Sequence, residues 1–96
     1  SNGKQKYAAL TEPAEDLSQK YIRVLKDGFA SMDMAQNILV VRTVSGMAMA
    51  VAAALDALNF HEIVGTIAGD DTIMCAVRSV EENIRLMDRL RKMVGK

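Results

Sequence analysis

Two adjacent carboxylates, Asp70 and Asp71, stand between two short apolar runs, Ile63 to Ala68 and Thr72 to Val77. Gly69 precedes them, and because Gly and Asp favour turn geometry, the pattern predicts a β-hairpin with both carboxylates at its tip. Like charges side by side repel, and nearby apolar surface makes this repulsion harder to screen. The corner is therefore either an ordinary solvated turn or a binding site for a cation.

A third carboxylate, Asp56, interrupts the most apolar segment of the chain, Gly46 to Leu58. This segment predicts a helix that is apolar on every side except at Asp56, whereas a helix at a solvent boundary should have a polar face. Since 96 residues supply too little material to cover it, we expect its second face to be buried against another subunit. A buried, unpaired carboxylate is costly, so Asp56 either faces water beside Asn59 or binds a cationic ligand.

Other kinds of chemistry find little support in the sequence. The single cysteine, Cys75, falls inside a predicted strand, and the single histidine, His61, stands in a loop where we expect a surface residue. Neither nucleophilic catalysis nor a histidine metal site is therefore expected. Paired carboxylates could still hold Mg²⁺, which leaves a small metal-dependent enzyme that uses Asp56, Asp70 and Asp71 as the alternative to a binding domain without catalytic activity or cofactor.

The composition narrows the classes of partner. The chain has 12 Lys and Arg against 12 Asp and Glu, and no long basic run, so it is a poor candidate for binding a phosphate backbone by itself. A single thiol fits a reducing cytoplasm. The most apolar segment is too short to span a bilayer and no signal peptide opens the sequence, so we expect a cytoplasmic protein without a membrane partner.

Apolar periodicity predicts how these residues are positioned. Residues 1–13 are polar and small and are expected to be a linker remnant, and residues 14–96 form one domain. We expect an α+β fold, an oligomeric two-layer sandwich in which a four-stranded, mainly antiparallel sheet packs against helices. The predicted elements, in order, are a helix over Ala14 to Asp27, strands over Phe29 to Met34 and Ile38 to Thr43, a helix over Gly46 to Leu58, strands over Ile63 to Ala68 and Thr72 to Val77, and a last helix from Ser79.

Two of these elements carry more detailed expectations. The strand Ile38 to Thr43 is apolar on both faces at its centre, so we expect both faces to be covered. In the last helix, Ser79 and Glu82 form a capping box. One apolar stripe of that helix is expected to face the core: Val80, Ile84, Met87, Leu90 and Val94.

These motifs together resemble a known family. Thr43 to Gly46, the sequence Leu55 to Leu58 that ends the alanine-rich helix, and above all Gly65 to Ile73 resemble the C-terminal domain of bacterial arginine repressors. The resemblance extends from about Asp16 to the end of the chain. It implies an L-arginine-binding, oligomerising domain that forms a homo-hexamer of two stacked trimers, with arginine as co-repressor at the interface between the trimers.

The resemblance also implies roles for individual residues. Asp56, Asp70 and Asp71 correspond to the acidic ligand-binding positions, where an aspartate of the hairpin corner takes the guanidinium from across the interface and the others hold the α-ammonium. Backbone near Ala68 contributes hydrogen bonds. Met49 departs from the family, which often has a polar amide or imidazole there, so the hydrogen bond that such a group would give to the bound amino acid is missing.

The family pairs this domain with an N-terminal winged helix-turn-helix that binds operator DNA. That domain is absent from the 96 residues. The resemblance thus implies a sensing and assembly part of a transcriptional repressor, which reaches DNA only through the N-terminal domain.

Overall fold

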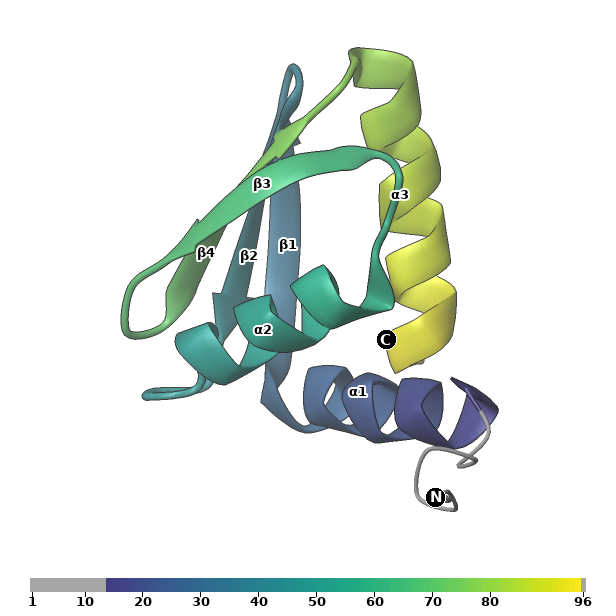
Figure 1. The fold of residues 1–96 in the computed structure, drawn as a ribbon. Helices are drawn as coiled ribbons and strands as arrows, with labels where there is room; N and C mark the ends of the chain where they lie inside the picture. Colours follow the sequence, from purple (N-terminus) through teal and green to yellow (C-terminus); the bar gives the residue numbers. More distant parts are fainter. Residues whose placement is uncertain (1–13, 96) are drawn as a thin grey trace.

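The computed structural model describes residues 14–95 and confirms the predicted α+β fold (Figure 1). The predicted linker over residues 1–13 lies outside the described residues. All the pairings in the single four-stranded sheet are antiparallel, in the order β1-β2-β4-β3. The elements are α1 (Ala14–Gly28), β1 (Phe29–Ala35), β2 (Ile38–Thr43), α2 (Ala48–Leu58), β3 (Ile63–Ala68), β4 (Thr72–Val77) and α3 (Val80–Val94).

The helices α2 and α3 lie against one face of the sheet, and α1 packs against α2 and α3 (Figure 1). Along β2, Leu39 and Val41 are fully buried on this face, whereas Ile38 and Val40, which point the other way, are only half-buried. On β4 the opposite-facing Met74 is 52% exposed. The expectation that β2 is covered on both faces is therefore not met among residues 14–95, because no described element lies on the second face.

The helix α2 begins at Ala48, two residues later than the sequence predicted. Gly46 has a positive φ of 81°, which places it in a turn, and the amide of Met47 donates to the carbonyl of Val44 at 3.1 Å. Gly tolerates this left-handed conformation because it has no Cβ. The connection from β2 therefore closes as a turn before the helix starts.

One face of α2 is buried and the other is exposed. Val51 and Leu55 are buried in the core, and α1 approaches this face so closely that a Cβ on Gly28 would lie 2.6 Å from a methyl group of Val51. The opposite, exposed face is apolar except at Asp56. Within residues 14–95, neither α2 nor any other helix is long and apolar enough to cross a membrane.

The face that α3 presents to the core matches the predicted stripe only in part. Ile84 is 52% exposed and Val80 is exposed, whereas Leu86 and the polar Asn83 are fully buried. The side chain of Asn83 donates to the carbonyls of Gln36 at 3.0 Å and Ile38 at 3.2 Å. These bonds tie the start of α3 to the turn between β1 and β2.

The other expected feature of α3 is confirmed in part. The hydroxyl of Ser79 accepts a hydrogen bond from the amide of Glu82 at 3.1 Å, as in a capping box. The reciprocal bond is missing, because Oε1 of Glu82 is buried and has no hydrogen-bond partner among the described residues. The rest of the predicted stripe, Met87, Leu90 and Val94, is buried.

We expect Asn83→Ala to lower the free energy of unfolding by about 2 kcal/mol, because it leaves two carbonyls without their donor. The same change also removes the hydrogen bond to the carbonyl of Gln36. Gln36 has a positive φ of 57°, a backbone conformation that residues other than glycine rarely adopt. Urea unfolding of the variant and of Glu81→Ala, an exposed control on the same helix, measures the effect. Equal stability of the two variants would show that Asn83 does not hold this turn.

Candidate functional site

The Gly69–Asp71 corner joins β3 and β4 as the predicted β-hairpin and packs against the start of α2. The amide of Gly69 donates to the carbonyl of Thr72 at 2.8 Å and closes the hairpin. The carbonyl of Asp70 accepts from the amide of Ala48 at 3.1 Å, and that of Asp71 accepts from the amide of Thr43 at 2.8 Å. Backbone bonds thus fix the corner, while both aspartate residues are exposed.

The surroundings of the corner favour negative charge. Ala48 is the first residue of α2, so the two carboxylates lie at the end of the helix where the macrodipole is positive. In addition, the hydroxyl of Thr72 donates to Oδ1 of Asp71 at 2.9 Å. These contacts offset part of the repulsion between Asp70 and Asp71 and leave their outward oxygens accessible to a cation.

Asp56 lies at the opposite end of α2. Its residue is exposed, and the hydroxyl of Thr66 on β3 donates to its carboxylate, at 3.2 Å from Oδ1 and 3.5 Å from Oδ2. A shallow cavity of about 150 Å³ opens beside it, lined among others by Asn59 and Val64. The helix macrodipole is negative at this end, so Asp56 lacks the backbone support that the corner has.

The two acidic positions are far apart within one chain. Ala48, which binds the corner, and Asp56 are on one helix, and the helical rise places them about 12 Å apart. The strand β3 gives a similar value for the separation of Asp56 from the corner. Thr66 contacts Asp56, and the rise from Thr66 to Asp70 along an extended chain is about 13 Å. The three aspartates of one chain therefore do not form a single cluster of carboxylates. Residues 14–95 contain no group of three or more His, Cys, Asp or Glu side chains that could hold a metal ion.

An apolar strip on α2 connects the two acidic ends. It consists of the exposed residues Met49, Ala50, Ala53 and Ala57. Met49 is 72% exposed and follows Ala48, so it lies at the corner end of the strip rather than beside Asp56. This strip is the surface for which the sequence predicts a second subunit.

The remaining sequence-predicted residues are placed as follows. Ala68 is half-buried at the end of β3, where it pairs with Ile73 and packs against the core. His61 is exposed, as expected. Cys75 is buried without a disulfide, and burial, with a smaller contribution from the charge of Asp56, raises the pKa of its thiol to about 11. The thiol is therefore protonated near neutral pH and is a poor nucleophile.

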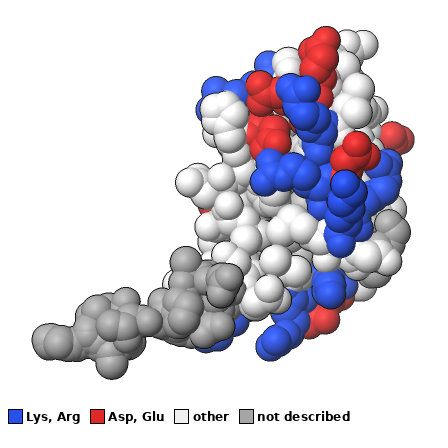
Figure 2. All heavy atoms as spheres, turned by 90° about the vertical axis from the view of Figure 1, so that its right-hand side faces the viewer, with Lys and Arg blue, Asp and Glu red and all other residues white. Residues whose placement is uncertain are grey.

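Charges of both signs alternate on the surface of α3 (Figure 2). Asp88 and Arg91, for example, form an ion pair at 3.4 Å on this helix. The sequence has no long basic run, and the space-filling view of this side accordingly shows blue and red side chains interspersed. This side of the molecule does not have the uniform positive charge that a phosphate backbone would require.

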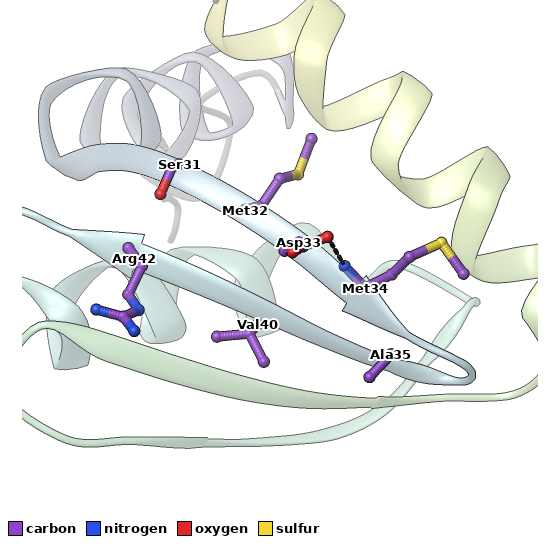
Figure 3. A pocket seen from close by; sticks show the side chains of 7 residues that line it. All are labelled: Ser31, Met32, Asp33, Met34, Ala35, Val40 and Arg42. Carbon is purple, nitrogen blue, oxygen red and sulfur yellow. Dashed lines mark hydrogen bonds between the residues drawn. The ribbon is translucent and has the colours of Figure 1, made fainter.

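The uncovered face of the sheet has hollows that do not contain the predicted ligand residues. One of about 520 Å³ lies along β1 and β2, where Met32 and Met34 point toward the helices and Val40 and Arg42 point the other way (Figure 3). Another, of about 430 Å³, is lined by apolar side chains that include Ile67 and Met74. Ile67 is 79% exposed. The hollow around Ile67 and Met74 is part of a second apolar surface, separate from the strip on α2.

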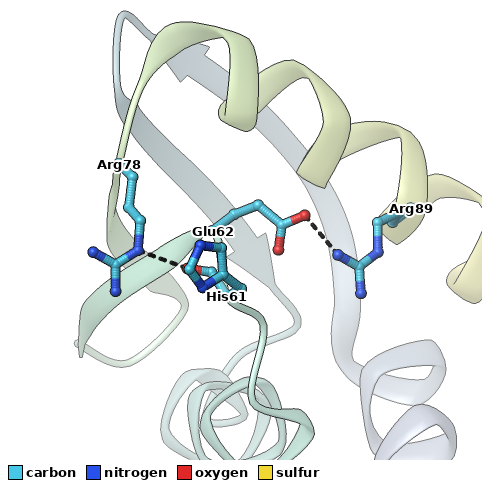
Figure 4. Close-up of polar contacts among 4 residues, drawn as sticks. All are labelled: His61, Glu62, Arg78 and Arg89. Atoms are coloured by element: carbon cyan, nitrogen blue, oxygen red, sulfur yellow. Dashed lines mark hydrogen bonds and ion pairs between the residues drawn. The ribbon is translucent and has the colours of Figure 1, made fainter.

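A group of contacts that the sequence pattern did not reveal fixes the connection from α2 to β3 (Figure 4). The carboxylate of Glu62, which is only 7% exposed as a residue, forms an ion pair with Arg89 of α3 at 2.5 Å. The guanidinium of Arg89 also lies 4.9 Å from the centre of the buried Phe60 ring. Arg78 donates to the carbonyl of His61 at 2.8 Å. In the sequence, the only sign that Glu62 is buried is the apolar residue Ile63 next to it. Its partner Arg89 lies 27 positions further along the chain, so no local pattern connects the two.

Comparison with known proteins identifies relatives of this chain. The family model described as arginine repressor, C-terminal domain, matches residues 25–92. The arginine repressor of Lachnoclostridium phytofermentans is 66% identical over 94 residues, which cover 98% of this chain and 62% of that protein. The arginine repressor of Lachnospira eligens is 58% identical over a stretch that covers 93% of this chain and 59% of that protein. The arginine repressor of Caldicellulosiruptor saccharolyticus is 37% identical, and the match covers 97% of this chain and 61% of that protein. The chain thus spans about three fifths of the length of these relatives.

The contact between Glu62 and Arg89 predicts a pH-dependent contribution to stability. Burial raises the pKa of the Glu62 carboxyl, but hydrogen bonds from the backbone and from Arg89, with the charges of Arg89 and His61, outweigh it and hold the pKa below its ordinary value of 4.5. The contribution of the ionised carboxylate is then fully present above pH 4.5 and is lost as the pH falls through the lower, folded-state value.

We therefore expect Glu62→Gln to lower the free energy of unfolding by about 1 kcal/mol at pH 7, a value that allows for the partial exposure of Arg89. The difference from the parent should shrink as the pH falls below 4.5. Urea unfolding at a series of pH values measures it, with Glu81→Gln on the exposed side of α3 as the control. A difference that stays constant down to pH 3 would contradict the assignment.

Proposed function

Because this chain belongs to the arginine repressor family, we propose that it is the part of a transcriptional repressor of arginine metabolism that senses L-arginine and self-associates. Operator DNA would be bound by an N-terminal winged helix-turn-helix domain outside these residues, and the whole protein would act in the cytoplasm. The proposed activity is ligand binding without catalysis, with L-arginine as co-repressor and no further cofactor.

The observation that carries the proposal is the placement of the three aspartates at the two ends of one exposed apolar strip. Two copies of α2 that face each other in opposite directions would bring Asp56 of one chain toward Asp70 and Asp71 of the other. A guanidinium matches carboxylates because it offers a planar fork of donors. In this arrangement the corner of one chain takes the guanidinium, and Asp56 of the facing chain helps to hold the α-ammonium, with hydrogen bonds from backbone near Ala68.

Ligand binding and assembly are then coupled. Two carboxylates about 4 Å apart repel by roughly 4 kcal/mol at an effective dielectric constant near 20. A bound arginine reverses the sign of this interaction, so arginine favours the facing arrangement and the facing arrangement favours arginine. Met49, at the corner end of the strip, offers apolar contact to the methylene groups of the ligand but no hydrogen bond.

The proposed homo-hexamer of two trimers needs two different contact surfaces on each chain. A ring of three uses a head-to-tail contact, and the stacking of two rings uses a self-complementary one. The described residues offer two exposed apolar surfaces, the strip on α2 and the open sheet face around Ile67 and Met74. Exposed apolar surfaces of this kind are typical of interaction sites. We assign the strip on α2 to the contact between trimers, because both acidic positions adjoin it.

Calorimetry with L-arginine, combined with a mass measurement on the same sample, tests this function. We expect saturable binding by the parent and an increase in assembled mass with arginine at low protein concentration. Asp56→Asn, Asp70→Asn and Asp71→Asn should each reduce binding at least tenfold while the fold is retained, because each removes a charge-assisted contact worth roughly 1.5–3 kcal/mol.

Asp33→Asn is the matched control, since Asp33 is an exposed aspartate on β1, at the edge of the sheet opposite β3. It should bind arginine like the parent. The assignment of the site would be wrong if the three variants also bound arginine like the parent. A parent that shows no heat with arginine but gains thermal stability from Mg²⁺ or Mn²⁺ would favour the metal-dependent alternative.

A further inference from the structure

We propose that Thr66 is a positioning residue for the arginine site, whose hydroxyl holds the carboxylate of Asp56 in the orientation that the ligand requires. This inference rests on the proposed function and concerns a residue that does not itself need to touch arginine. Thr66 lies on β3, ten positions after Asp56, and its bond to that carboxylate joins the edge of the sheet to the end of α2.

Asp56 needs such a partner because little else fixes its side chain. Its residue is exposed, and the negative end of the α2 macrodipole disfavours its charge. Within residues 14–95, the hydroxyl of Thr66 is the one hydrogen-bond donor to its carboxylate. Without this donor the carboxylate would exchange between rotamers, and arginine binding would have to select one of them at an entropic cost.

Thr66 is well suited to act as the fixed partner. It stands opposite Cys75 in the middle of the β3–β4 pairing, so its backbone is held by the ladder. A β-branched side chain has few χ1 rotamers, and its hydroxyl carries one proton to donate. The carboxylate of Asp56 can accept about four hydrogen bonds, so the bond from Thr66 orients it and leaves acceptor positions open for a ligand.

The other two aspartates are held in a different way. Backbone bonds fix the corner itself, and the hydroxyl that reaches Asp71 belongs to its direct neighbour, Thr72. Among the hydroxyl–carboxylate bonds of the described residues, the contact from Thr66 to Asp56 is the one that connects two different elements of the fold. The orientation of the Asp56 carboxylate thus depends on how α2 packs against β3, because the bond from Thr66 links the two elements.

Two measurements on Thr66→Val and Thr66→Ser test the inference. Valine keeps the β-branched shape but removes the hydroxyl, so the sheet should form normally. We expect Thr66→Val to bind L-arginine roughly fivefold to tenfold more weakly than the parent, the effect of losing a partly solvated charge-assisted hydrogen bond. Thr66→Ser should regain most of the affinity, because it restores the donor.

The second measurement does not depend on arginine. Three-bond NMR couplings of Asp56 in the ligand-free protein should show one χ1 rotamer in the parent and in Thr66→Ser, and averaged rotamers in Thr66→Val. A merely structural role of Thr66 would leave these couplings unchanged. Ser31→Ala, which removes a hydroxyl on β1 far from β3, is the control and should match the parent in both measurements. Thr66→Ala replaces Thr66→Val if the valine variant does not fold.

The outcomes separate this inference from the proposed function. If the parent does not bind arginine, the proposed function fails, and the couplings still decide whether Thr66 orients Asp56. If the parent binds arginine and Thr66→Val binds it equally well, or if the Asp56 couplings are the same in both proteins, the positioning role of Thr66 is overturned.

Discussion

The helix α2 acts as a rigid spacer between two acidic positions. Its first residue binds the backbone of the hairpin corner, and its last turn carries Asp56. Because a helix has a fixed rise per residue, these positions stay about 12 Å apart in every copy of the chain. At this distance the three carboxylates of one chain do not gather around a single point. The distance also makes a second copy the natural source of the missing carboxylates in the proposed assembly.

The rest of the fold serves to fix this spacer. The α1 helix packs against α2 at Gly28, where a side chain would clash with Val51. The sheet holds the corner at one end of α2 and Thr66 at the other. The ion pair between Glu62 and Arg89 ties the connection after α2 to α3. The contacts from the sheet and from the connection join segments far apart in the sequence, so the position of Asp56 depends on tertiary packing.

The sequence predicted the features that depend on local pattern. Apolar periodicity located all seven elements, and the Gly-Asp-Asp string located the hairpin corner. The features it missed depend on partners distant in the chain. The burial of the polar Asn83 goes with its bonds to the turn between β1 and β2, and the start of α2 follows from the positive φ of Gly46. A pattern of apolar residues on β2 could not tell whether the second face is covered by the same chain or by another.

The central claim is that carboxylates from two different chains form one arginine site, and mixed oligomers test it most directly. Asp56→Asn and Asp71→Asn, each expected to bind arginine at least tenfold more weakly by itself, are purified separately with different tags. They are then unfolded together and refolded, and the hetero-oligomers that carry both tags are isolated. In these, a minority of the sites combines an intact Asp56 with an intact Asp71 from the partner. The account predicts that calorimetry detects arginine binding by the mixed oligomers at an affinity near that of the parent. Mixed oligomers that assemble but bind no arginine would contradict it, because the aspartates would then have to act within one chain.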